Sequence, residues 1–186
     1  MINVSVEGHA LIESKSEKLL GVITNRDGNW KSHLHGDGNK NKGLVLDLSK
    51  RIGMLKKLKR NLSVKKFKIL IDGLFTSKLT YGITAWGSVW GYEAKYQEEN
   101  LNMMTMRKAD MRKLQVLQNS TLRLLLGKRY DASMHSLLTE SKSLSVNQTV
   151  AYSMMSQVWK IRKSGQPRYH YDRLFGRITN PDVNTQ

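Results

Sequence analysis

The sequence predicts a mainly α fold, with about four main helices and a short β-hairpin, or two to three strands, at the N-terminal end. Apolar residues recur at the three- and four-residue spacing of a helix over most of residues 44–163. The alternation typical of strands is confined to the first residues. Only two prolines occur in the 186 residues, both beyond Gln166, so no proline interrupts long helices upstream of them.

Charge and composition limit the function. The chain has 31 Lys+Arg against 15 Asp+Glu, a formal net charge of +16, which favours nucleic acid or an anionic membrane surface as partner. Cysteine is absent, which excludes disulfides, thiolate metal sites and Cys nucleophiles. No stretch approaches the roughly 18 apolar residues of a membrane span, and the first residues lack the features of a signal peptide. We therefore expect an intracellular protein, nuclear or cytoplasmic, that is not secreted. A membrane-surface role for the basic helix is possible, but no lipidation motif lies beside it, and we expect no membrane partner.

Residues 1–32 predict short strands. Apolar residues alternate with polar ones over residues 2–6, and Gly8 separates this run from a second one, which predicts a hairpin. Residues 18–24 are a further short apolar run with Gly21 inside it. Two or three strands are marginally stable alone, so we expect them to lie on another element.

The Gly-rich residues 33–43 predict a flexible connector. Three residues in it, His33, His35 and Asp37, have side chains that bind metals. Because their alternation is not fixed by a helix, we predict no metal site and no cofactor.

Residues 44–62 predict an amphipathic helix around which the chain is organised. Lys50, Lys56, Lys57 and Arg60 fall on one face. The opposite face is apolar and consists of Leu44, Leu48, Ile52, Leu55, Leu58 and Leu62. Two further cations, Arg51 and Lys59, flank the apolar stripe. No acidic residue occurs between Ser49 and Ile71, so the cations have no local partner at helical spacing. The pattern is that of an ordinary solvated helix, or of a cationic surface that binds a polyanion.

A second helix is predicted from Val64 to about Ala85, after a break at residues 61–63. Its expected buried face consists of Phe67, Leu70, Ile71, Leu74, Tyr81 and Ala85. Lys65 and Lys66, at its start, extend the cationic surface. Tyr81 and Trp86 are candidates for stacking on bases, although aromatic residues at a helix end more often fill the core.

Residues 91–109 lose the helical period and predict an irregular insert. Asp110 is expected to cap a third helix with an apolar face from Met111 to Leu125, which Gly127 ends. Ser145 and Gln148 have the spacing of a capping box at the start of a last long helix that runs to about Lys163. Residues 110–175 therefore predict C-terminal helices, and residues 176–186 a loose tail.

Five motifs, in this order, resemble the segment that follows the catalytic palm in reverse transcriptases of non-LTR retrotransposons. The first is Leu20-Gly21-Val22, preceded by Lys18-Leu19 and followed by Trp30-x-x-His33, and the second is the basic helix of residues 48–62. The third is Tyr81-Gly82 with Trp86-Gly87. The fourth is Leu114-Gln115-Val116-Leu117-Gln118-Asn119 with Arg123, and the fifth is Leu144-Ser145-Val146 with Gln148 and Tyr152. The likeness covers roughly residues 15–175.

The resemblance implies a remnant primer-grip-like β segment in residues 1–32, with Leu20, Gly21 and Val22 at the grip. It implies that residues 44–90 form a helical, thumb-like bundle whose basic face lies on a template–primer duplex of RNA or DNA. The expected nucleic-acid-binding residues are Lys50, Arg51, Lys56, Lys57, Lys59, Arg60, Lys65 and Lys66. The family holds two Mg²⁺ ions on a paired Asp-Asp. This chain has no Asp-Asp, so we expect the palm to lie upstream of Met1, and no catalysis by this chain on its own.

Three hypotheses follow from these patterns. The first is a non-catalytic nucleic-acid-binding module without a small-molecule substrate, which contacts phosphates through the basic helix. The second is a fragment of an RNA-directed DNA polymerase that is active only with a palm domain elsewhere, in trans or in a longer reading frame. The third is a relic with no selected role.

Overall fold

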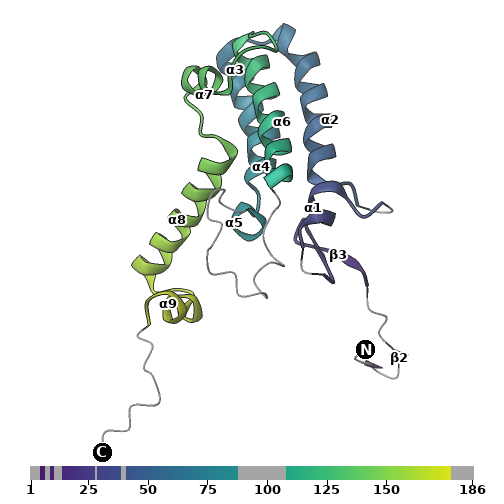
Figure 1. Cartoon of the computed structure of the whole chain (residues 1–186), viewed down its shortest axis with the longest axis vertical. Coiled ribbons are helices and arrows are strands. Elements are labelled where there is room, and N and C mark those ends of the chain that lie inside the picture. Colours follow the sequence, from purple (N-terminus) through teal and green to yellow (C-terminus); the bar gives the residue numbers. More distant parts are fainter. Residues whose placement is uncertain are drawn as a thin grey trace, which may run out of the picture.

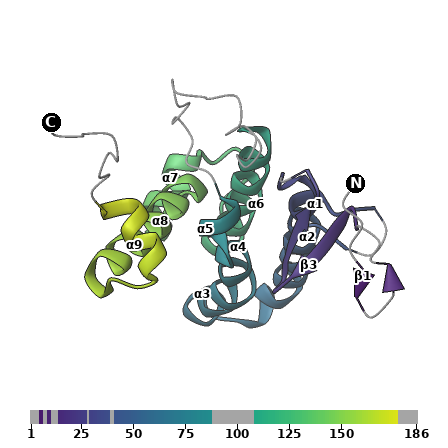
Figure 2. The same cartoon turned by 90° about the horizontal axis from the view of Figure 1, so that it is seen from below.

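A computed structural model of the chain describes residues 5–6, 9–10, 14–27, 29–38, 41–87 and 108–176. It is mainly helical, with short antiparallel strands near the N-terminus, as the sequence predicts. Figure 1 shows α2 (Leu44–Leu58), α6 (Lys108–Leu126) and the helices between them side by side. The helices α8 (Val146–Ser164) and α9 (Arg168–Phe175) descend on the far side from α2. The strand β3 (Ser16–Leu19) and the helix α1 (Lys31–His35) lie at the foot of α2. Figure 2 shows the same arrangement from below.

Four short strands form two antiparallel pairs in the described residues. β1 (Ser5–Val6) pairs with β2 (His9–Ala10), and β3 (Ser16–Leu19) pairs with β4 (Val22–Asn25). The apolar run of residues 18–24 spans two strands and not one, because Leu20 and Gly21 form a two-residue turn with φ of 47° and 85°. Positive φ at both central positions matches the twist of a tight hairpin.

The flexible connector expected at residues 33–43 is wrong for its first three residues, which are helical. Residues Lys31–His35 form helix α1, and Gly36 and Lys42 pair as an isolated bridge. The Asp37 carboxylate accepts hydrogen bonds from the backbone and side-chain N–H groups of Asn41. Gly43 then leads into the next helix at a point where a Cβ would collide with the backbone of residues 34–36. A residue larger than glycine therefore does not fit at position 43.

Helix α2 (Leu44–Leu58) continues into a 3₁₀ turn, η1 (Lys59–Asn61). Its buried face is largely the predicted one, with Leu44, Leu48, Ile52 and Leu55 in the core. Leu62 is partly buried against the same core. Leu58 departs from the prediction, since 40% of its surface is exposed where the helix reaches the end of the bundle.

The predicted second helix is a broken one. It consists of α3 (Val64–Ile71), a π-helical turn η2 (Asp72–Thr76), α4 (Ser77–Thr80) and α5 (Ile83–Trp86). The backbone turns at Tyr81 and at Gly82, whose φ is 63°. A glycine adopts this left-handed conformation readily, and the conformation ends the helix.

This break changes which residues are buried. Phe67 and Ile71 are in the core as predicted, and Leu70 and Leu74 are partly buried. Tyr81 and Ala85 are exposed, contrary to the prediction. The buried face continues instead through Phe75, Leu79, Ile83 and Trp86.

A four-residue repeat drifts by about 40° per step around a regular α-helix of 3.6 residues per turn. The wider π turn takes up one extra residue and returns Phe75 and Leu79 to the core side. The apolar residues at four-residue spacing from Phe67 to Leu79 therefore all face the core only because the helix is irregular.

Four more helices complete the described fold: α6 (Lys108–Leu126), α7 (Met134–Ser141), α8 (Val146–Ser164) and α9 (Arg168–Phe175). The capping box of Ser145 and Gln148 is confirmed, and Gly165 ends α8 with φ of 67°. Asp110 lies inside the first turn of α6 rather than at its cap. Residues 88–107, most of the predicted insert, and residues 177–186 of the predicted tail lie outside the described residues.

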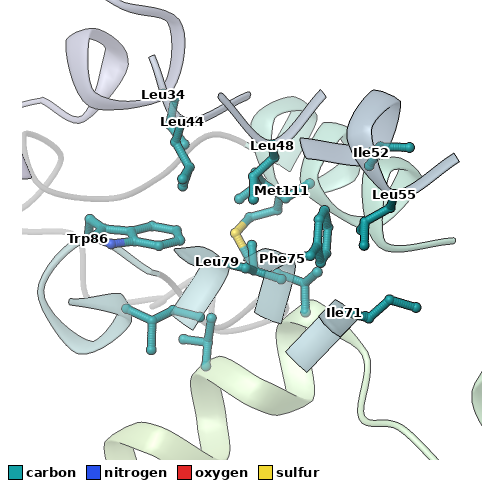
Figure 3. Close-up of a cluster of buried hydrophobic side chains, with 14 of the residues drawn as sticks. Leu34, Leu44, Leu48, Ile52, Leu55, Ile71, Phe75, Leu79, Trp86 and Met111 are labelled. Atoms are coloured by element: carbon teal, nitrogen blue, oxygen red, sulfur yellow. The ribbon is translucent and has the colours of Figure 1, made fainter. Parts of the chain in front are cut away.

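One core unites α2, the α3–α5 segment, α6 and the start of α8 (Figure 3). Leu48, Phe75 and Met111 come from three of these elements and lie close together at its centre. Leu48 and Leu114 are completely buried. The burial of this apolar surface is the main favourable contribution to stability, and it holds α2 by one face.

We expect Phe75→Ala to destabilise the fold much more than Leu74→Ala. Phe75 is 2% exposed, and truncation of a buried Phe costs roughly 3–5 kcal/mol, whereas Leu74 is only partly buried. Urea unfolding followed by circular dichroism measures both free energies. A regular α-helix through residues 64–85 would place Leu74 inward, and the opposite order of the two losses would support it.

Candidate nucleic-acid interface

The outward side of α2 and η1 carries the four cations that the sequence assigns to it. We call Lys50, Lys56, Lys57 and Arg60 the basic face. All four side chains are exposed, whereas the opposite side of the helix is in the core. Because the core fixes the rotation of α2, these cations are held on one side of the molecule.

The basic face continues at the start of α3. Lys65 and Lys66 are exposed in its first turn, which contains no acidic residue. Ser63 occupies the N-cap position, and its side chain makes no capping hydrogen bond. Cations at the positive end of a helix are unfavourable, and an anion beside them removes part of that cost.

Acidic residues are scarce around this surface. Within α2 to α4 of the described structure the carboxylates are Asp47 and Asp72. Asp47 pairs with Arg51 and Lys78, and Asp72 accepts a hydrogen bond from Thr76. Among the residues that the structure describes, no ion pair involves Lys56, Lys57 or Arg60. Lys56 and Lys57 lie four and three residues before Arg60, a spacing at which like charges repel on a helix.

Two predicted phosphate ligands have structural contacts. Arg51 is half-buried, with Nε 3.4 Å from Asp47 Oδ2 and Nη1 donating to the Leu74 carbonyl at 2.9 Å. Arg51 therefore links α2 to η2, and it would have to give up these contacts to bind a phosphate. Lys59 is half-buried, and its Nζ is the atom nearest to a Cβ built on Gly127, at 3.9 Å. A cation there complements the C-terminal end of α6.

Lys50 differs from the other cations of the basic face because Lys42 is close to it. The neighbouring Lys42 ammonium group lowers the pKa of Lys50, because a neutral Lys50 amine can accept a hydrogen bond from it and escapes its repulsion. Lys50 therefore lies where positive charge is concentrated, in the N-terminal half of α2.

The structure separates the two candidate stacking residues. Trp86 is fully buried, and its indole N–H donates to the Tyr81 carbonyl at 2.8 Å. It fills the core and cannot stack on a base, so the stacking prediction is wrong for Trp86. Tyr81 is 51% exposed, and its hydroxyl donates to the Leu20 carbonyl at 2.6 Å. Its ring remains accessible for stacking, but its hydroxyl holds the hairpin turn.

The primer-grip-like residues lie at this hairpin turn. Leu20 is 83% exposed, and Leu19 beside it is 65% exposed. Gly21 approaches the Tyr81 ring so closely that a Cβ would lie 3.3 Å from Cε1. Val22 packs partly against the core. The turn is thus fastened to the α4–α5 junction and presents two leucines to solvent.

The histidines of α1 have separate structural roles. His35 Nε2 lies 2.8 Å from Asp110 Oδ1, which joins α1 to α6. His33 is buried, and its Nδ1 accepts a hydrogen bond from the Ile23 amide at 3.3 Å. The described residues contain no group of three metal-binding side chains. Sequence reasoning missed the importance of His33, since only the folded hairpin brings Ile23 to it.

No protein-family model, curated protein or solved structure matches the chain. The resemblance to reverse transcriptases therefore stays a prediction that rests on the five motifs. No helix among the described residues is long and apolar enough to cross a membrane.

We expect His33 to make stability depend on pH. Burial, with the nearby Lys78 charge, lowers the pKa of His33 from 6.5 to about 4. Between these values the unfolded chain binds the proton more readily, so stability is lost as the pH falls from about 6.5 toward 4. The difference corresponds to about 3 kcal/mol.

The measurement is the free energy of unfolding from pH 7 to pH 4 for the wild type and for His33→Gln. The variant should lose less stability over this range. His135→Gln, at an exposed position on α7, serves as control and should keep the wild-type dependence. Equal pH dependence in all three proteins would contradict the assignment.

Proposed function

We propose that the chain is a non-catalytic nucleic-acid-binding module that contacts the phosphate backbone through the basic face of α2 and the first turn of α3. The observation that carries this proposal is the exposure of Lys56, Lys57 and Arg60 on one side of a helix whose other side is in the core. No carboxylate among the described residues pairs with these three cations. A surface of unpaired positive charge on a rigid element attracts a polyanion.

The length of the surface suits a stretch of nucleic-acid backbone. Lys50 and Arg60 are ten residues apart, about 15 Å along a helix. Duplex DNA has one phosphate charge per roughly 1.7 Å of axis, so the basic face, which contacts the duplex from one side, reaches several phosphates. Lysine ammonium groups act as point charges without base readout. The expected binding is therefore independent of sequence, with Lys65 and Lys66 as outer contacts.

We expect log K for a labelled RNA–DNA or DNA duplex to fall against log salt with a slope near −4 to −5, for about four to six neutralised phosphates. The triple variant Lys56→Glu/Lys57→Glu/Arg60→Glu should bind more weakly, and its slope should be shallower by about 3. Fluorescence anisotropy at several salt concentrations measures both quantities.

A matched control is Lys160→Glu/Arg162→Glu/Lys163→Glu on α8, which changes the net charge equally on exposed residues far from α2. This control should retain most of the wild-type slope. A flat salt response of the wild type, or equal losses in the two triple variants, would rule out the basic face as the binding surface.

A second candidate function is that of a polymerase fragment that works beside a palm domain in trans. The exposed Leu19 and Leu20 at the hairpin turn favour it, because a partner that covered them would remove apolar surface from water. Its test is primer extension by a palm-containing fragment of a non-LTR reverse transcriptase, with and without this chain. Stimulation that Leu19→Ser/Leu20→Ser abolishes would support this function, and no stimulation would exclude it for that fragment.

A further inference from the structure

A pocket of about 420 Å³ lies at the N-terminal end of α2, between that helix, the β3–β4 hairpin, α1 and α4. Four lysines line it, each from a different segment: Lys18 on β3, Lys42 before α2, Lys50 on α2 and Lys78 on α4. The one carboxylate among its lining residues is Asp47. Asp47 already lies 3.9 Å from Lys78 and 3.4 Å from Arg51. The pocket therefore has an excess of positive charge that its own acid does not neutralise.

The N-terminus of α2 adds to this positive field. Leu44, the first residue of this 15-residue helix, lines the pocket. The N-cap residue, Gly43, has no side chain to accept a hydrogen bond from the first turn. The first backbone N–H groups of a helix lack intrahelical acceptors, and the helix dipole is positive at this end. Such a terminus favours an anion, and the lysines favour it independently.

A buried histidine supplies the most specific observation. His33 lines the pocket and is only 5% exposed. Because Nδ1 accepts the Ile23 amide hydrogen and the pKa of His33 is lowered to about 4, the neutral ring carries its proton on Nε2 at pH 7. Nε2 has no hydrogen-bond partner in the described structure. A buried donor without an acceptor is unfavourable, so His33, a lining residue of the pocket, would gain from a rearrangement that brought an acceptor to Nε2.

Among the residues that line the pocket, four ammonium groups thus face one carboxylate, at the N-terminal end of a helix. Ammonium groups suit an oxyanion, and the volume is in the range of small-ligand sites. A phosphate group has several acceptor oxygens and up to two negative charges, which matches several cations better than a single carboxylate does. We propose that this pocket binds a phosphate group, supplied either by the end of a nucleic-acid strand or by a free phosphate compound.

Lys50 connects this pocket to the basic face. It lines the pocket, and it is seven residues, or about 10 Å along the helix, from Lys57. A strand that lies along α2 could therefore place its terminal phosphate in the pocket. This assignment of the source rests on the proposed function, whereas phosphate binding itself rests on the pocket alone.

The first experiment titrates inorganic phosphate and pyrophosphate into the full chain and follows the His33 imidazole resonances by NMR. Both ligands should cause saturable shifts. Lys42→Gln/Lys78→Gln should weaken the apparent affinity by about tenfold or more, since each charge-assisted hydrogen bond contributes about that factor. Lys56→Gln/Lys57→Gln removes the same charge from the basic face and should leave the phosphate affinity nearly unchanged. The single variant Lys42→Gln, at an exposed residue, should show a smaller loss in the same direction if the double variant does not fold.

The second experiment distinguishes the two sources of phosphate. Anisotropy compares otherwise identical single strands that end in a 5′-phosphate or a 5′-hydroxyl, and the same pair at the 3′ end. Tighter binding of a phosphorylated strand by the wild type, lost in Lys42→Gln/Lys78→Gln, assigns the pocket to a strand end. Equal binding of all strands, with phosphate shifts retained, assigns it to a free phosphate compound.

Absence of saturable shifts with both phosphate and pyrophosphate would overturn the proposal, as would saturation by an acidic peptide but not by phosphate. The two proposals fail separately. Salt-dependent duplex binding without phosphate shifts removes only the pocket, and phosphate shifts without duplex binding remove only the role of the basic face.

Discussion

The burial of one face of α2 is the constraint on which the rest of this structure depends. Leu44, Leu48, Ile52 and Leu55 are fixed against α6 and the broken helix that follows α2. This contact sets the rotation of α2 about its axis. The cations at the remaining positions are then directed outward, whatever their own interactions. The positive surface is therefore a consequence of apolar packing and not of charge pairing.

A chain of polar contacts fixes the N-terminal end of the same helix. The Tyr81 hydroxyl holds the hairpin turn at Leu20, and the Trp86 indole holds the Tyr81 carbonyl. The Trp86 ring lies 5.4 Å from the His33 ring, between centroids. His33 in turn accepts the Ile23 amide hydrogen. These contacts join the hairpin, α1 and α5 around the start of α2, so the lysines from separate segments converge there without a direct attraction between them.

Local signals in the sequence explain what could be predicted. The apolar spacing of α2 and α6 and the capping box of α8 each lie within one element, and the structure confirms them. The π turn after Ile71 could not be predicted, because Leu74 and Phe75 are both apolar and only packing decides which one turns inward. For Trp86 the sequence favours the core over stacking, because aromatic residues at a helix end more often fill the core, and Trp86 is fully buried.

The pocket is a still clearer case of tertiary information. Lys18 and Lys78 are sixty residues apart in sequence, and no periodicity relates them or predicts that His33 lies beside them. The basic face follows from the order of residues along one helix, whereas the pocket exists only once the hairpin has docked. Sequence reasoning therefore finds the first surface and misses the second.

In both the basic face and the pocket, the cations destabilise the free chain by repelling one another. Like charges at helical spacing destabilise a helix by a few tenths of a kcal/mol per pair. The ammonium groups of Lys42 and Lys50 add repulsion at the end of α2. The core tolerates this cost because α2 is held by its apolar side. A ligand that binds only the folded state stabilises it in proportion to the logarithm of its concentration over Kd. Because an anion relieves the repulsion as it binds, the charges that weaken the free chain are the same ones that would make a bound complex more stable.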